Sequence, residues 1–268
     1  MILRLSVFAG LLLLFLFWEK VLPRREQGDL RRNRITNLIL SGVNSAVGAV
    51  VPVGAALIAR SAEAGGAGFL NRTGLPLPAE WVISLILLDL LIYLQHLMFH
   101  AVPLLWQLHK THHADSDLNV TTAVRFHPVE ILLSLLIKGG AVYVLGAPAG
   151  AVVLFEILLN GCSLFNHANM FIPFRADRLI RLVLVTPDMH RIHHSVRIRE
   201  TDSNFGFCLT WWDRLLGTYR SDPAAPQESM TLGISCYRKK EERSAVKSLL
   251  MPFDGKGAVY SLKGIGRM

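Results

Sequence analysis

Apolar regions separated by polar segments set the pattern of this 268-residue chain; they are residues 5–22, 35–59, 81–99 and 129–165. A helix needs roughly 20 mostly apolar residues to cross a bilayer, so each of the first three regions suits one crossing. The fourth, interrupted by Gly146 and Pro148, suits a helical hairpin. The pattern therefore predicts an all-α integral membrane bundle. Lys138 and Glu156 leave open whether the hairpin crosses the membrane fully, because ionisable groups are costly there.

Positive charge predicts the orientation of these helices. Lysine and arginine near membrane spans favour the cytoplasmic side, and an arginine cluster follows the first apolar region. The cluster consists of Arg24, Arg25, Arg31, Arg32 and Arg34. The N-terminus is then outside, the third region runs inward, and the loop 61–80, rich in Gly and Pro, is external. The polar segment after Tyr219 predicts a cytoplasmic tail.

Residues 174–185 predict a basic amphipathic helix at the membrane surface. Arg175, Arg178 and Arg181 recur every three residues between apolar positions such as Leu179 and Leu182. This pattern is typical of a helix that lies on anionic lipid. A soluble helix that packs its apolar side on a core is the alternative.

Composition supports the membrane assignment. Hydrophobic residues make up 51% of the chain, charged residues only 18%, and the mean hydropathy is +0.38, which argues against a soluble monomer or a disordered chain. The net charge of +8 gathers partly beside an apolar region, so it indicates membrane topology rather than nucleic-acid binding. Cys162, Cys208 and Cys236 form no CxxC motif, and we expect free thiols. From the compact length we expect a multi-pass protein of a bacterial inner membrane.

Histidine carries the chemistry that the sequence predicts. All ten histidines lie between positions 96 and 194, where one HxxxH and two HxxHH motifs space them three or four residues apart. Residues at that spacing project from one helix face, so their imidazoles can bind one ion. The predicted metal ligands are His96, His100, His109, His112, His113, His127, His167, His190, His193 and His194.

The number of histidines exceeds what one ion can bind, and two neighbouring ions with open positions suit it better. Iron, copper, nickel and zinc all accept imidazole, so the spacing does not identify the metal. For any single pair, a histidine satisfied within the core or anchored at the membrane interface is the alternative. The predicted topology brings the histidine motifs to the cytoplasmic side, where they can meet.

Several polar residues are candidates for orienting the imidazoles. Asp89 lies on the same helical face as His96, and it either accepts a hydrogen bond from an imidazole N–H or joins two helices. Asp213 is interpreted as structural. The other candidates are Asn166, Asn169, Asp188 and Asn204.

The histidine motifs resemble those of the fatty acid hydroxylase and sterol desaturase superfamily. The resemblance covers about residues 88–219 and rests on HxxxH at 96–100 and HxxHH at 109–113 and 190–194, beside the hydrophobic hairpin. Further segments that match are RFHPVE at 125–130, NHAN at 166–169, TPDMHRIHHS at 186–195, NFG at 204–206, WD at 212–213 and GTY at 217–219. The resemblance implies a catalytic region at 81–220, between N-terminal helices and a loop at 1–80 and a cytoplasmic tail at 221–268.

By this resemblance, the chain is an integral membrane, non-haem di-iron enzyme with a histidine-rich helical cap on the cytoplasmic face. Such enzymes use two iron ions and O2 to hydroxylate or desaturate an unactivated C–H bond of an acyl chain, sterol or isoprenoid-type lipid. Zinc can replace iron in purified material. His127 and His167 match the family's ligand positions less well than the other eight histidines. No catalytic residue is implied beyond the metal centre.

Electrons for this chemistry must come from a cytoplasmic reductase, ferredoxin or small haem carrier. The sequence has no CxxC iron–sulfur set, haem motif or GxGxxG nucleotide fingerprint. We therefore expect the lipid, the membrane and an electron donor as partners.

Two other functions also use histidines in membrane proteins. A metal transporter could line an ion path with histidines and Asp89, but its site should lie near the bilayer midplane, with access from both sides. A zinc-dependent membrane hydrolase needs a carboxylate base within its motif, as in HExxH, and neither HxxHH motif contains one. We favour the lipid oxidoreductase and retain these two alternatives.

Overall fold

Helices form the regular structure of the computed structural model, which describes residues 2–50 and 54–257. The predicted all-α fold is confirmed for these residues. The α-helices are α1 (Ile2–Val21), α2 (Leu30–Val50), α3 (Ala55–Ala64), α4 (Leu77–Ala101), α5 (Pro103–His113), α6 (Pro128–Leu145), α7 (Ala149–His167), α8 (Phe174–Ile180), α9 (Pro187–His193), α10 (Ile198–Thr201), α11 (Trp211–Leu215) and α12 (Ala245–Leu250). Short 3-10 helices are η1 (Leu70–Arg72), η2 (Val120–Val124), η3 (Lys240–Arg243) and η4 (Met251–Phe253).

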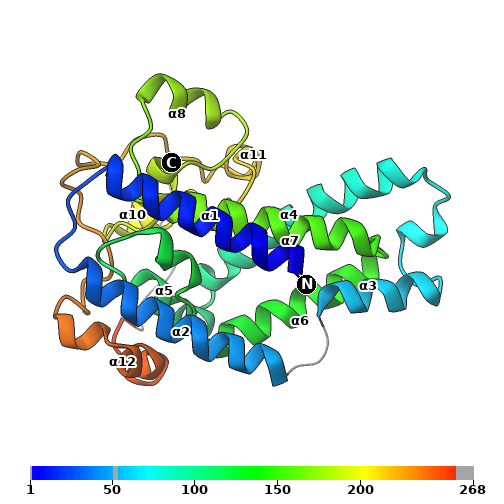
Figure 1. Cartoon of the computed structure of the whole chain (residues 1–268), viewed down its shortest axis with the longest axis horizontal. Coiled ribbons are helices and arrows are strands. Elements are labelled where there is room, and N and C mark those ends of the chain that lie inside the picture. Colours follow the sequence, from blue (N-terminus) through cyan, green and yellow to red (C-terminus); the bar gives the residue numbers. More distant parts are fainter. Residues whose placement is uncertain (1, 51–53, 258–268) are drawn as a thin grey trace.

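The long helices build a bundle suited to a bilayer. Five stretches of the described chain are long and apolar enough to span a membrane, and Figure 1 shows α1, α2, α4, α6 and α7 running broadly along the long axis. Leu88 and Ile92 of α4 pack with Val142 of α6 and Phe155 of α7 in a buried core. The outer faces expose apolar side chains such as Phe17, as a lipid-facing surface does.

The predicted hairpin at 129–165 is present as α6 and α7. Gly146 ends α6 with a φ of +69°, a conformation that glycine adopts without steric cost. Lys138 Nζ donates to Glu156 Oε1 across the hairpin at 2.9 Å. These two ionisable residues therefore pair with each other between the helices.

The predicted apolar region 35–59 falls within one candidate span, residues 30–64. The structure describes α2 as far as Val50 and α3 from Ala55, with an extended backbone at Gly54. Pro52 lies outside the described residues.

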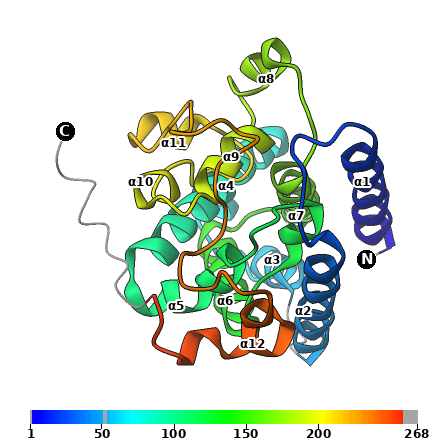
Figure 2. The same cartoon turned by 90° about the vertical axis from the view of Figure 1, so that its left-hand side faces the viewer.

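The predicted helix at 174–185 is shorter than expected. Helix α8 ends at Ile180, and the chain then turns so that Leu184 pairs with Leu209 in an isolated bridge. Phe174 and Leu179 of α8 remain exposed, and α8 projects from the molecule in Figures 1 and 2. Exposed apolar and basic side chains on one short helix fit the predicted contact with a lipid surface.

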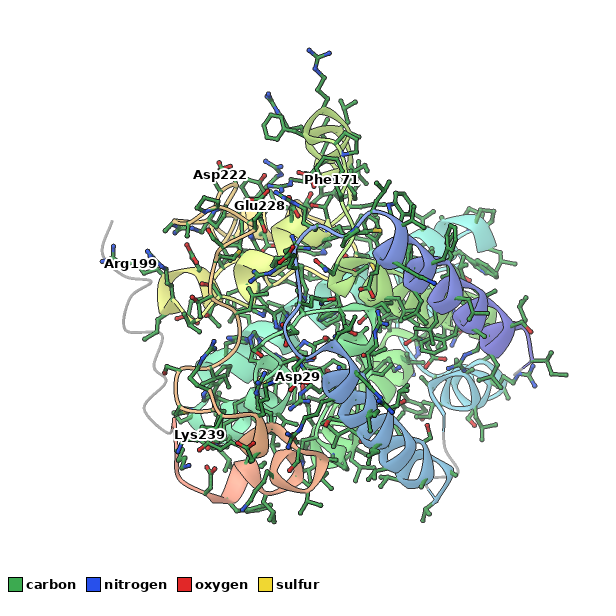
Figure 3. The ribbon with its side chains drawn as sticks, turned by 60° about the vertical axis from the view of Figure 1, so that its left-hand side comes forward. Asp29, Phe171, Arg199, Asp222, Glu228 and Lys239 are labelled. Atoms are coloured by element: carbon green, nitrogen blue, oxygen red, sulfur yellow. The ribbon has the colours of Figure 1, made fainter. Side chains whose placement is uncertain are left out.

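A polar cap, residues 103–125 and 186–257, covers one end of the long helices. Figure 2 looks onto this end and shows α5, α9, α10, α11 and α12 in front of the bundle, and Figure 3 shows Arg199 and Lys239 on its outer surface. The expected C-terminal tail is part of this cap as far as the structure describes it. Arg125 Nη2 donates to Ser248 Oγ at 2.8 Å, and Thr111 Oγ1 donates to the Ser248 carbonyl at 3.1 Å.

Glu19 of α1 forms hydrogen bonds to the loops that lie between the bundle and the cap. Its Oε1 accepts backbone N–H bonds from Val120 at 2.6 Å and Asn169 at 2.7 Å, and its Oε2 pairs with Arg34 at 2.7 Å. A buried carboxylate with these partners is satisfied, and it fixes the ends of α1 and α7 relative to η2.

Candidate metal centre

Nine of the ten histidines converge in two buried groups at the junction of α4, α5, α7 and α9. Within each group, one ligand nitrogen from every residue lies within 4.8 Å of the others. The five-histidine group is His96, His100, His109, His113 and His193, and the four-histidine group is His112, His167, His190 and His194. The two groups adjoin, because the rings of His113 and His194 stack with centroids 4.4 Å apart.

Each HxxHH motif supplies both groups. In the first motif, His109 and His113 enter the five-histidine group and His112 enters the other. In the second motif the assignment is exchanged, and His193 alone joins the five-histidine group. Residues four apart lie nearly above one another on a helix, whereas the residue three along is rotated to the side. This rotation lets one short helix contribute imidazoles to both groups.

Hydrogen bonds at Nδ1 fix the orientation of the rings. His96 Nδ1 donates to the Phe205 carbonyl at 2.8 Å, and His109 Nδ1 donates to Glu130 Oε1 at 2.6 Å. The other Nδ1 bonds are from His112 to the Arg125 carbonyl at 3.1 Å, from His167 to the Ser163 carbonyl at 2.6 Å and from His193 to the Ser203 carbonyl at 2.9 Å. Such bonds select the tautomer whose Nε2 has a lone pair to bind a metal.

The resulting Nε2 atoms face one another at short range. The Nε2 atoms of His96 and His109 are 3.2 Å apart, and those of His112 and His167 are 3.1 Å apart. Two lone pairs cannot form a hydrogen bond, so neutral rings held this way repel unless a cation lies near both. The arrangement therefore fits two metal ions, one bound by each group.

Burial keeps the cap histidines neutral. Desolvation, followed by the neighbouring imidazoles, lowers the pKa of His112, His113, His190 and His194 well below 6.5. Burial also lowers the pKa of His193 to about 3. Neutral imidazole is the form that binds metal ions, so these residues need to lose no proton at pH 7.

His127 lies outside both groups, unlike the other nine predicted ligands. Its Nδ1 accepts the backbone N–H of Val129 at 3.2 Å, so His127 caps the start of α6. Its Nε2 lies 3.2 Å from the carbonyl of Leu249 in the C-terminal part of the cap. These contacts give His127 a structural role.

Asp89 joins two helices, the second of the alternatives considered for it. Its Oδ2 accepts a hydrogen bond from Trp212 Nε1 of α11 at 2.8 Å and from the backbone N–H of Leu209 at 3.2 Å. This contact holds the segment after Phe205 against α4. Asp89 thus supports the five-histidine group through the backbone rather than through an imidazole.

Among the remaining supporting candidates, the three asparagines bond to backbone carbonyls and Asp188 pairs with two arginine side chains. Asn204 Nδ2 donates to the Met189 carbonyl at 3.0 Å, next to His190, and Asn166 Nδ2 donates to the Phe207 carbonyl at 2.6 Å. Asn169 Nδ2 donates to the Arg25 carbonyl at 2.8 Å. Asp188 accepts from Arg24 Nε at 3.0 Å and from Arg191. These bonds position the loops around the second HxxHH motif.

Three acidic residues support the site without having been predicted to do so. Glu130 contacts His109 directly, and Asp202 Oδ1 lies 3.8 Å from His100 Nδ1. Asp213 accepts N–H bonds from Phe205 at 2.8 Å and Gly206 at 2.9 Å, and thereby holds the carbonyl that orients His96. Glu130 follows the proline that begins α6, a sequence signal for the first turn of a helix, but nothing local links it to His109.

A cavity of 390 Å³ opens beside the five-histidine group. His96, His109 and Glu130 line it at the metal end, and the apolar side chains of Ile92 and Phe207 line its walls. It continues between α4, α6 and α7 into the membrane-spanning part. A long, largely apolar substrate could reach the imidazoles from within the bundle.

The sequence is similar to those of known proteins. The fatty acid hydroxylase family profile matches residues 81–218. An ornithine lipid hydroxylase of Rhizobium tropici is 28% identical over 90% of this chain and 70% of its own length. Human alkylglycerol monooxygenase is 29% identical over 54% of this chain and 32% of its own, and mouse cholesterol 25-hydroxylase is 30% identical over 60% and 53%. No solved structure matches this chain significantly.

The matched region contains every histidine of both groups, together with the hairpin that carries the cavity. The names of these relatives are those of hydroxylases and monooxygenases, which are oxidising enzymes. This chain therefore belongs to the fatty acid hydroxylase family and is a membrane-spanning oxidoreductase.

Proposed function

We propose that this protein oxidises an unactivated C–H bond of a lipid with O2 at a di-iron centre. The observation that carries the proposal is the pairing of Nε2 lone pairs in two adjoining histidine groups beside an apolar cavity. The names of the relatives support a lipid as the substrate. His96, His100, His109, His113 and His193 would hold one ion, and His112, His167, His190 and His194 the other.

Iron held by these residues would supply the activation of O2 and the removal of hydrogen from the substrate carbon. Hydroxylation converts the C–H bond, O2, two electrons and two protons into an alcohol and water; desaturation with the same O2 and electrons removes a second hydrogen and releases two waters. The protein's own part is orientation and exclusion of water. Glu130, the Phe205 carbonyl and the Ser163 carbonyl hold the rings, and Phe126, stacked on His112, lines the cavity near them.

The reaction needs electrons from outside the chain. A cytoplasmic reductase, ferredoxin or small haem carrier would meet the polar cap, whose outer surface carries charged residues such as Arg199 and Lys239. This assignment places the cap on the cytoplasmic side, as the arginine cluster predicts. The catalytic part would comprise 81–220 together with the C-terminal segment that covers α5.

The arrangement supports an oxidoreductase better than a transporter. Transport needs access to the metal from both sides of the membrane, whereas the histidines of both groups lie in the last turns of α4 and α7 and in α5 and the α9 region. A zinc hydrolase would share the ligands, and Glu130 is a carboxylate near them, so the identity of the metal and the product decide between these chemistries.

The proposal is tested with the purified protein in lipid nanodiscs, supplied with O2, a reductant and a lipid extract. We expect iron in the protein and new hydroxylated or desaturated lipid detected by mass spectrometry. Replacing His109 and His193 together with alanine should abolish the product. Zinc with ester or amide cleavage, or product formation by the double variant, would overturn the proposal.

A further inference from the structure

The cavity that begins at His96 and His109 also contacts a cluster of charged side chains. Lys138 Nζ donates to Glu156 Oε1 at 2.9 Å, and Arg4 Nη1 pairs with Glu156 Oε2 at 2.8 Å. All three residues line the cavity; the side chains of Lys138 and Glu156 are only 15% and 6% exposed, whereas that of Arg4 is 40% exposed. Two cations share one carboxylate, so the cluster has one positive charge in excess.

This charged cluster lies far from the imidazoles along the bundle. Lys138 follows Glu130 on α6, and the helical rise places the two roughly 12 Å apart along the axis. Glu156 precedes His167 on α7 by a distance of roughly 16 Å. Both helices therefore put the cluster about half the thickness of the hydrocarbon core from the metal site. A purely hydrocarbon substrate gives no reason for an excess cation at that depth.

The wall between the two ends combines apolar side chains with a few neutral polar ones, among them Asn160 and Ser163 of α7. Ile92, Leu135 and Leu159 line the cavity, and Gln95 Nε2 donates to Ser134 Oγ at 2.9 Å. A volume of 390 Å³ lies near the lower limit for small-molecule sites, which suits one hydrocarbon chain better than a lipid with two.

We propose that Lys138 and Arg4 bind the carboxylate of a single-chain amphiphile whose hydrocarbon chain extends along the cavity to the imidazoles. This inference rests on the proposed function for the fate of the chain but concerns how the substrate is recognised. A bound carboxylate would neutralise the excess charge. It would also accept hydrogen bonds from those N–H groups of Lys138 and Arg4 that do not contact Glu156.

A carboxylate suits this position better than a phosphate. A carboxylic acid has an ordinary pKa of about 4 to 5 and can enter an apolar region in its neutral, protonated form. A phosphate stays charged near pH 7, so its entry into an apolar region has an unfavourable free energy of desolvation. The proposal also predicts that the oxidised carbon is remote from the carboxylate, because the charged cluster and the imidazoles lie at separate places along the bundle.

Equilibrium binding to the purified protein in nanodiscs tests the proposal without any oxidation. The probes are palmitate, its methyl ester and hexadecyl phosphate. We expect palmitate to bind at least about tenfold more tightly than either of the others. Equal binding of palmitate and its ester, or tighter binding of the phosphate, would overturn the proposal.

Variants at the cluster distinguish recognition from a purely structural ion pair. Lys138→Gln should reduce the preference for acid over ester to less than about threefold, whereas Glu156→Gln, which removes the competing carboxylate, should increase it. Arg60→Gln, an exposed cation of α3 that does not line the cavity, is the matched control and should leave the preference unchanged. Loss of stability in both cluster variants with an unchanged preference would contradict the proposal.

The two proposals fail in distinguishable ways. If the di-iron function is wrong, palmitate still binds with the expected preference but no oxygenated product forms. If the inference is wrong, oxidised lipid forms while acid and ester bind alike. With active protein and palmitate, mass spectrometry should place the new hydroxyl or double bond away from the carboxyl end, and oxidation of the carbon next to the carboxylate would contradict the inference.

Discussion

The Nε2 atoms of His112 and His167 lie 3.1 Å apart, although each ring already donates from its Nδ1 to a backbone carbonyl. The two residues come from different helices, α5 and α7, and are brought together by the fold. Two neutral acceptors at this distance are stable together only with a cation between or beside them. This contact is the local reason for interpreting the four-histidine group as a metal site.

Replacing a member of the four-histidine group should reduce the amount of bound metal, whereas replacing His127 should not. We expect His167→Ala to lower bound iron from about two to about one per chain, because an incomplete set of imidazoles holds its ion weakly. His127→Asn keeps a side chain that can cap α6 and should retain both ions. Metal analysis of both purified variants provides the measurement, and equal losses in the two would contradict the assignment.

Glu130 should tune the metal site through His109. Glu130→Ala removes the acceptor for His109 Nδ1, and we expect activity to fall about 10- to 100-fold. Glu130→Gln keeps a neutral acceptor and should retain an intermediate activity. Turnover at saturating lipid, with metal content measured in parallel, checks this order. Glu241→Gln, at an exposed position of the cap, serves as control, and full activity of Glu130→Ala would refute the role.

The stability of the folded protein should depend on pH through Asp213 of the cap. Burial raises the pKa of Asp213 to about 6 from an ordinary value of 3.8. The folded state therefore holds this proton more tightly than the unfolded state between these values. The associated stabilisation is fully present below pH 4, and about 3 kcal/mol of it is lost as the pH rises through 6.

Thermal unfolding of the wild type and Asp213→Asn from pH 4 to pH 7 measures this effect. Because asparagine does not titrate, the stability of the wild type relative to the variant should fall over this range. A difference that is constant with pH would show an ordinary pKa for Asp213 in the folded protein, and one that grows in favour of the wild type would show a lowered pKa; either would contradict the prediction.

The orientation of the bundle can be tested by labelling. In a background with Cys236→Ser, a cysteine at Arg72, in the loop between α3 and α4, should react with a membrane-impermeant thiol reagent in intact cells. A cysteine at Lys239, on the outer surface of the cap, should react only after permeabilisation. The reverse pattern would place the histidine groups outside.

Sequence spacing predicted nine histidines that the fold brings together, but not how they divide into two groups. His112 and His113 are adjacent in the chain, yet they enter different groups because each residue turns the helix by about 100°. Each group also contains histidines from other helices, such as His193 of α9 in one and His167 of α7 in the other. The division therefore depends on how α5 packs against α7 and α9. Local periodicity carries no information about such contacts.

His127 and Glu130 show the same limit at one helix start. Both lie in the segment that resembles the family, and Pro128 begins α6 between them. His127 caps the start of this helix, whereas Glu130, in its first turn, accepts a hydrogen bond from His109. Asp89 could be placed on the face of His96 from sequence alone, whereas its partner Trp212 lies in α11, far along the chain. The long apolar helices were predictable because a bilayer demands a continuous run of apolar residues.

Mössbauer spectroscopy of the wild-type protein, produced with iron-57 and kept in nanodiscs, can show whether the two adjoining histidine groups hold a pair of iron ions. We predict about two iron ions per chain, with the spectrum of a magnetically coupled pair. A single isolated iron, or zinc at full occupancy in protein that still oxidises lipid, would rule out a di-iron centre.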